Sequence, residues 1–170
     1  MKKHNGMRPQ DVVILLKIAS KKLLPWQMKD LAMELMISSS EVSESINRSV
    51  QSGLISVDKK TLIKGAVLEF LNHGLKYVYP QHTGAMVRGI ATAHSAQPLK
   101  KLIQSNENYV WSWPEGNVRG QSIQPLHPSV SAACMKDKDL YELLSLTDAL
   151  RLGKKREQEI AFKLLEKKLK

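Results

Sequence analysis

The chain has 170 residues, of which 42% are hydrophobic and 25% are charged; this is the composition of an ordinary globular protein and excludes disorder over most of the length. Its apolar runs are far shorter than the roughly 18 residues of a membrane span, and no cleavage site for a secretory signal follows the first of them, so we expect a cytoplasmic protein without a membrane segment. The 26 Lys and Arg residues outnumber the 16 Asp and Glu residues and give a net charge of +10, which favours polyanionic partners but, being spread along the chain, locates no binding face.

The first periodic segment predicts a helix with one buried face. It begins near Pro9, a residue suited to a first helical turn, and we expect Pro25 to end it because proline lacks the amide that continues a helix. Apolar residues recur along it at three- and four-residue intervals: Val12, Leu15, Leu16, Ala19 and Leu23.

Two short helices are predicted next. The first starts at about Gln27 and turns Met28, Leu31, Ala32 and Leu35 inward. For the second, Ser38 and Glu41 have the spacing of a capping box, and Gly53 stands where a helix takes its left-handed terminal residue. Apolar residues four positions apart give this helix a buried side: Val42, Ile46 and Val50. Residues 54–57 are expected to form a short strand.

The rest of the sequence predicts both helices and strands, so we expect an α+β fold. We expect a linking helix over 59–73 and then a small antiparallel sheet within 76–124. Its strands are expected at 76–79, 85–93, 109–113 and 118–123, the last two joined as a hairpin by the turn at 114–117. Residues 95–108 are expected to form a loop or a short helix, and C-terminal helices are expected over 130–169 with a break near Gly153.

The two short helices carry the most specific pattern in the chain. Over residues 9–57 it resembles the helix-turn-helix of bacterial winged-helix transcription regulators, which implies a DNA-binding domain at 9–57 and a separate α+β domain at 58–170. The resemblance is carried by Leu31-Ala32, Leu35, Ile37-Ser38, Val42-Ser43, Ile46 and Gly53-Leu54-Ile55. Without reference to the family, two helices that share such a core leave the outer side of the second helix free to enter a major groove.

We therefore expect sequence-specific binding of double-stranded DNA by a transcriptional regulator, which acts as a homodimer because one helix covers only a few base pairs. Hydroxyl, amide and guanidinium groups on the outer side of the helix suit phosphates and base edges. The candidate DNA-binding residues are Ser39, Ser40, Ser43, Asn47, Arg48 and Gln51, with Lys59 and Lys60 as phosphate contacts or a solvated turn.

Three features of the sequence leave a different class of protein open. Met36 stands where the family often has glycine, Glu44 where it often has a basic residue, and residues 58–60 replace the expected wing. In this alternative the chain is a protein-interaction module, similar to an antitoxin or an adaptor, with a vestigial helix-turn-helix and a protein partner bound through the sheet or the C-terminal helices. A third hypothesis places single-stranded nucleic acid on the alternating rings of Tyr109, Trp111 and Trp113, which are otherwise packing residues.

Signals for catalysis are poor. The histidines lack metal-ligand spacing, and no phosphate-binding glycine loop, carboxylate pair or nucleophile motif is present. Cys134 is the single cysteine, so it forms no intramolecular disulfide, and we expect it to be buried rather than to act as a thiol sensor. We predict no enzyme activity, no cofactor and no metal.

Overall fold

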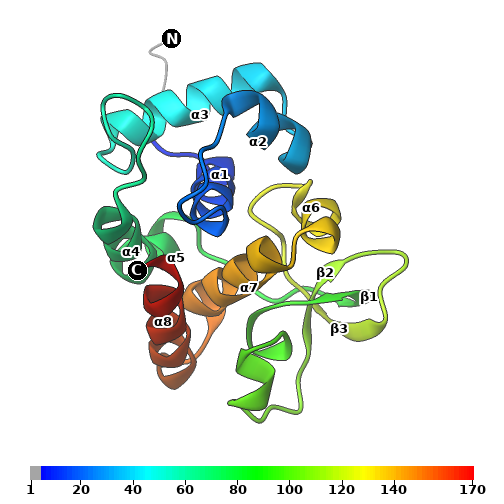
Figure 1. The fold of residues 1–170 in the computed structure, drawn as a ribbon. Helices are drawn as coiled ribbons and strands as arrows, with labels where there is room; N and C mark the ends of the chain where they lie inside the picture. The colour runs from blue at the N-terminus through cyan, green and yellow to red at the C-terminus, as the bar shows by residue number, and fades with distance from the viewer. Residues whose placement is uncertain (1–4) are drawn as a thin grey trace.

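The computed structural model describes residues 5–170 of the chain (Figure 1). Its α-helices are α1 (Pro9–Ser20), α2 (Met28–Leu35), α3 (Ser39–Gln51), α4 (Lys64–His73), α5 (Leu75–Val78), α6 (Val130–Lys136), α7 (Lys138–Leu152) and α8 (Lys155–Leu169). Its strands are β1 (Met86–Ala91), β2 (Tyr109–Ser112) and β3 (Val118–Ser122), and the 3-10 helices are η1 (Ala93–Ser95) and η2 (Leu99–Lys101). The fold is α+β, with helices before and after a small sheet. None of the helices within residues 5–170 combines the length and the apolarity needed to cross a membrane.

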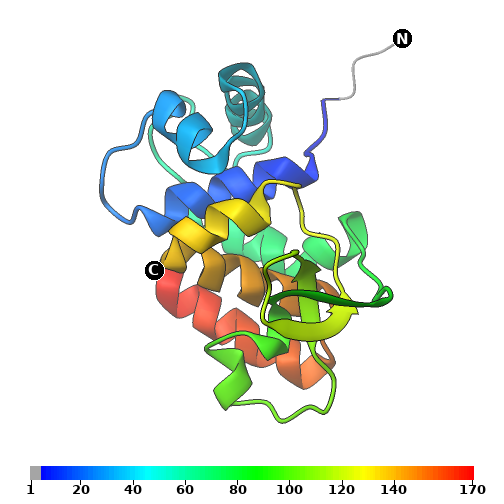
Figure 2. The ribbon, with the colours of Figure 1, turned by 90° about the vertical axis from the view of Figure 1, so that its right-hand side faces the viewer.

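Helix α1 lies at the centre of the molecule. Figure 2 shows α2 and α3 on one side of it and α6, α7 and α8 on the other. All of residues 11–18 are buried, as expected for a helix that is apolar around most of its circumference. The predicted end of this helix was wrong. It ends at Ser20 because Lys22 adopts a left-handed backbone with a φ of 58°, and Leu23, expected inside, is 94% exposed.

Helices α2 and α3 form where the apolar pattern placed them. Leu31 and Leu35 of α2 and Val42 and Ile46 of α3 are fully buried. Between the helices, Met36 takes the left-handed conformation with φ 54° and ψ 42°, which glycine adopts more easily. Helix α3 then begins with Ser38 accepting a hydrogen bond from the amide of Glu41 at 3.3 Å, and Gly53 after its end has the expected positive φ of 72°.

The segment between α3 and α4 differs from the prediction. Ile55 pairs with Leu62 in a single antiparallel bridge, and the amide of Ser56 donates to the carbonyl of Thr61 at 2.8 Å. The tip is closed by Asp58, which accepts from the amide of Lys60 at 3.1 Å. We call residues 54–63 the short hairpin. Because this hairpin uses residues 59–63, the linking helix begins at Lys64 and not at 59.

The sheet has three strands, and its pairing corrects the predicted antiparallel hairpin. Strands β2 and β3 each pair antiparallel with β1 and pair parallel with one another. Both meet β1 at Gly89, which lies opposite Ser112 and Val118. The turn between them packs so closely on Gly89 that a Cβ on Gly116 would lie 2.3 Å from its carbonyl oxygen. Residues 76–79 were expected to form the first strand, but residues 76–78 belong to α5.

The sheet is attached to α7 by the buried carboxylate of Asp148. This group accepts hydrogen bonds from the indole Nε1 of Trp111 at 2.7 Å and the hydroxyl of Thr92 at 2.8 Å, and it pairs with Arg151 at 3.0 Å. Complete burial raises the pKa of Asp148, while the Arg151 charge acts in the opposite direction. The two carboxylate oxygens of Asp148 therefore connect β2, the segment after β1 and the end of α7.

Replacing Asp148 with Ala is expected to lower the free energy of unfolding by about 3 kcal/mol. The substitution leaves the Arg151 charge and the Trp111 indole N–H buried without their acceptor. Urea unfolding followed by circular dichroism measures the change. Glu159→Ala, at an exposed position of α8, is the matched control and is expected to stay within about 0.5 kcal/mol of the parent. Equal midpoints for the two variants would show that Asp148 does not hold the sheet.

Candidate nucleic-acid interface

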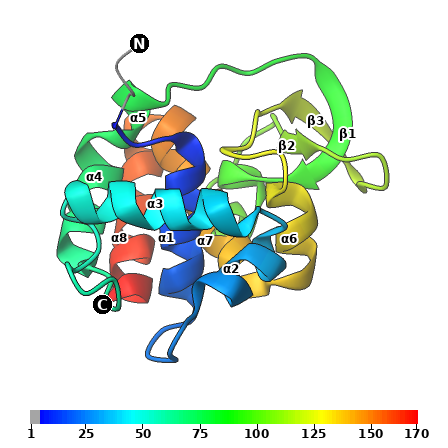
Figure 3. The ribbon, with the colours of Figure 1, turned by 90° about the horizontal axis from the view of Figure 1, so that it is seen from above.

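The outer side of α3 is open to solvent. Figures 1 and 3 show α3 lying across one end of the molecule, above α1, with no other helix or strand of residues 5–170 over its outer side. Four of its predicted site residues are exposed, and Ser43 is half-buried. The exposed residues are Ser39, Ser40, Asn47 and Gln51.

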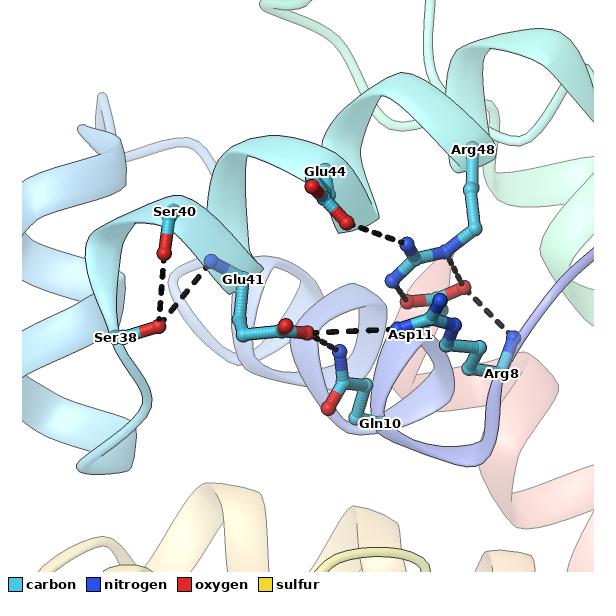
Figure 4. A network of polar contacts seen from close by, with 8 residues as sticks. All are labelled: Arg8, Gln10, Asp11, Ser38, Ser40, Glu41, Glu44 and Arg48. Atoms are coloured by element: carbon cyan, nitrogen blue, oxygen red, sulfur yellow. Dashed lines mark hydrogen bonds and ion pairs between the residues drawn. The ribbon is translucent and has the colours of Figure 1, made fainter. Parts of the chain in front are cut away.

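Arg48, the sixth candidate on α3, was predicted to point outward, and this prediction was wrong. Its side chain is 7% exposed and points inward to Asp11 of α1 (Figure 4). Nε donates to Oδ2 of Asp11 at 2.8 Å, and Nη2 donates to Oδ1 at 2.7 Å. These hydrogen bonds with Asp11 raise the pKa of Arg48. Arg48 is thus an anchor that fixes α3 on α1 rather than a group available to DNA.

Helical periodicity does not decide whether the side chain of Arg48 points inward or outward. Arg48 is three residues after the buried Ser45 and one before the buried Ser49, so it lies at the edge of the inner side of the helix. Asp11 is the acidic residue of the first turn of α1, and it also accepts from the backbone amide of Arg8 at 2.8 Å. A carboxylate that both caps one helix and pairs with another requires a tertiary contact, which spacing along the chain does not reveal.

The two glutamates of α3 are each paired with a basic residue. Glu41 accepts from the side-chain amide of Gln10 at 2.6 Å and lies 3.7 Å from Arg8. Glu44 lies 3.6 Å from Nη1 of Arg48 (Figure 4). Their negative charges are therefore partly compensated by groups of α1 and of α3 itself, which lowers the repulsion that an approaching phosphate would meet.

Lys59 and Lys60 are exposed at the tip of the short hairpin. The hairpin follows the C-terminal end of α3 directly, because Gly53 turns the chain and Leu54 and Ile55 are buried immediately after it. Lys59 has a left-handed φ of 59°, as a residue at the tip of a tight turn can have. Two positive charges thus stand beyond the end of α3 that carries Gln51.

Cys134 and Trp111 are both buried, so neither presents its thiol or its ring to solvent. Within residues 5–170, no group of three or more His, Cys, Asp or Glu side chains is placed to hold a metal ion. Cys134 is buried, and burial raises the pKa of its thiol, which leaves it protonated and unreactive. Trp111 is 1% exposed and bound to Asp148, so the alternating rings do not form the stacking row of the third hypothesis.

Comparison of the chain with protein-family models, with curated proteins and with solved structures finds no match. The geometry of α3 and the charges around it are therefore the basis for a functional assignment.

Replacing Arg48 with Ala is expected to lower the free energy of unfolding by about 3 kcal/mol, because Asp11 would remain buried without its partner. Chemical denaturation measures this loss. The neighbouring exposed Asn47→Ala variant is the control, with an expected change within about 0.5 kcal/mol. An Arg48→Ala protein as stable as the parent would contradict the role of Arg48 as an anchor.

Proposed function

We propose that the chain is a transcriptional regulator that binds double-stranded DNA in a sequence-specific manner, with α2 and α3 acting as a helix-turn-helix. The observation that supports this most is the open, polar outer side of α3. An α-helix with its side chains is about 10 to 12 Å in diameter, and the major groove is about 12 Å wide, so the groove admits a helix such as α3. The left-handed turn at Met36 fits the same arrangement.

The exposed groups of α3 divide by position into two kinds of DNA contact. Ser39 and Ser40 lie in the first turn, where hydroxyls and free helix amides suit a phosphate. Asn47 and Gln51 lie further along, where a side-chain amide can pair with the N6 and N7 of adenine, and Ser43 stands between the two groups. Arg48 has no part in this interface.

The short hairpin supplies the charge that α3 itself lacks. In the proposed complex Lys59 and Lys60 contact phosphates beside the groove, in the place where winged-helix proteins carry a wing. Such contacts strengthen binding to every sequence and release counterions, so their contribution falls as salt rises. The net charge of +10 favours approach to DNA in general.

The proposal predicts different losses for base-reading and phosphate-binding residues. A duplex is first selected from a random library, and its affinity is then measured by fluorescence anisotropy over a salt series. Asn47→Ala is expected to weaken binding to the selected duplex by about 1 to 3 kcal/mol, with little change in nonspecific binding. The double variant Lys59→Ala with Lys60→Ala is expected to weaken binding to all duplexes and to reduce the salt slope by about two. Asn106→Ala, in an exposed loop elsewhere, is the control.

Failure to enrich any duplex would refute the proposed function. An unchanged affinity of Asn47→Ala for an enriched duplex would instead refute the assignment of α3 as the reading helix, since the parent would still bind DNA by another surface.

We further propose that the regulator acts as a homodimer on a two-fold symmetric site. The expected result in sedimentation velocity is a species of twice the 19.1 kDa chain mass, and the selected duplex should contain two inverted half-sites about one helical turn apart. A monomer bound to a single asymmetric site would contradict this part of the proposal.

A protein-interaction module remains the second candidate, and one observation favours it. The loop after α1 exposes two neighbouring large apolar side chains, Leu23 at 94% and Leu24 at 70%, and exposed apolar surface is what a protein partner covers. The leucines of α7 and α8, by contrast, are mostly buried within the chain, so a partner would use this loop rather than the C-terminal helices. Co-purification of a stoichiometric protein, with no duplex selected and no salt-sensitive retention of the chain on DNA, would favour this candidate.

A further inference from the structure

Two arginines lie directly opposite each other on neighbouring strands of the sheet. Arg88 of β1 and Arg119 of β3 are register partners in the antiparallel pair, and both side chains are exposed. Partners in such a pair project from the same side of the sheet with Cβ atoms about 4.5 to 5.5 Å apart. The two guanidinium groups therefore share one small region of the surface.

Neither of these arginines has an acidic partner among the described residues, unlike three other arginines of the chain. Arg8 pairs with Glu41, Arg48 with Asp11 and Arg151 with Asp148. Like charges directly opposite on adjacent strands destabilise a sheet. The free protein thus holds an unfavourable pair of cations that a bound anion would stabilise.

The two arginines border a hollow in the surface of about 370 Å³. The turn between β2 and β3 closes one side of it through Gly116 and Asn117. This turn is held rigidly, because the amide of Gly116 donates to the carbonyl of Trp113 at 3.0 Å and that of Trp113 donates to the carbonyl of Arg88 at 3.1 Å. The backbone of Arg88 is thereby hydrogen-bonded to the chain that enters the turn at the rim of the hollow.

We propose that this hollow is a binding site for a phosphate group, either inorganic phosphate or the phosphate of a small phosphomonoester. Guanidinium groups present planar forks of N–H donors that match phosphate oxygens, and the side-chain amide of Asn117 adds a neutral donor at the rim. Two positive charges suit the charge of a phosphate dianion.

The site is separate from α3. Figures 1 and 2 show α6 between the sheet and α2, so a duplex lying on the outer side of α3 would not lie over the hollow. The inference is consequently independent of the proposed function, and either can fail without the other.

The test is an NMR titration of the arginine Nε–Hε signals with inorganic phosphate, at constant ionic strength maintained with chloride. We expect the signals of Arg88 and Arg119 to move together and to saturate, while that of Arg156, an exposed arginine of α8, stays in place. Arg88→Gln and Arg119→Gln are each expected to weaken binding at least about tenfold, and Arg156→Gln to leave it unchanged.

A second measurement separates binding from a purely structural role of the pair. Without phosphate, Arg119→Gln should unfold at the same temperature as the parent or a higher one, because the repulsion with Arg88 is removed. At the same concentration, phosphate should raise the melting temperature of the parent more than that of the variant.

A titration with a nucleoside monophosphate distinguishes the two sources of the phosphate group. Binding about tenfold tighter than that of inorganic phosphate would assign a phosphomonoester, and equal binding would assign the free ion. The proposal is overturned if no saturable shift occurs, if Arg156 moves equally, or if only duplex DNA moves the signals of Arg88 and Arg119.

Discussion

The ion pair between Asp11 and Arg48 determines how the N-terminal part of the chain is arranged. It joins the start of the central helix α1 to the inner edge of α3 through two hydrogen bonds of 2.8 and 2.7 Å, and the same carboxylate caps α1 by accepting from Arg8. Burying a charged pair stabilises a structure only when its geometry satisfies both groups, so the pair also selects one orientation of α3. With Val42 and Ile46 packed beneath the helix, that orientation leaves Ser39, Asn47 and Gln51 on the outside.

A second buried ion pair has the same role at the other end of the molecule. Asp148 is buried against Arg151, and its oxygens also receive Thr92 and Trp111, so a carboxylate on α7 positions the sheet as Asp11 positions α3. Helices α1 and α7 pack together at the centre and each carries one of these groups. The two exposed surfaces considered above, the outer side of α3 and the hollow between Arg88 and Arg119, are therefore supported by different buried charges.

Much of the fold was predictable because it depends on signals that are local in the chain. The start of α1 at Pro9 and the turn at Gly53 come from single residues with a restricted or a permissive backbone. The break at Gly153 depends on space, because a Cβ there would lie 2.5 Å from the carbonyl oxygen of Ala149. The wrong predictions concern features that depend on contacts between segments far apart in the chain. Strands β2 and β3 cannot be recognised as parallel without β1, on which β2 ends and β3 begins opposite Gly89. Arg48 cannot be recognised as buried without Asp11, 37 residues away. The exposed residues of α3 were predictable from helical period, since Val42 and Ile46 define the inner side; the charged residue at the edge of that side was not.

The burial of Arg48 changes what the net charge of +10 means for binding. Arg48 and Arg151 neutralise buried carboxylates, so these cations contribute to the fold and little to the field at the surface. On the outer side of α3 the remaining groups are hydroxyls and amides, which discriminate by hydrogen-bond geometry and attract weakly over distance. Lys59 and Lys60 supply attraction from the adjoining hairpin. In the proposed complex, selectivity and attraction therefore reside in different segments, and changes in either segment should alter one property with little effect on the other.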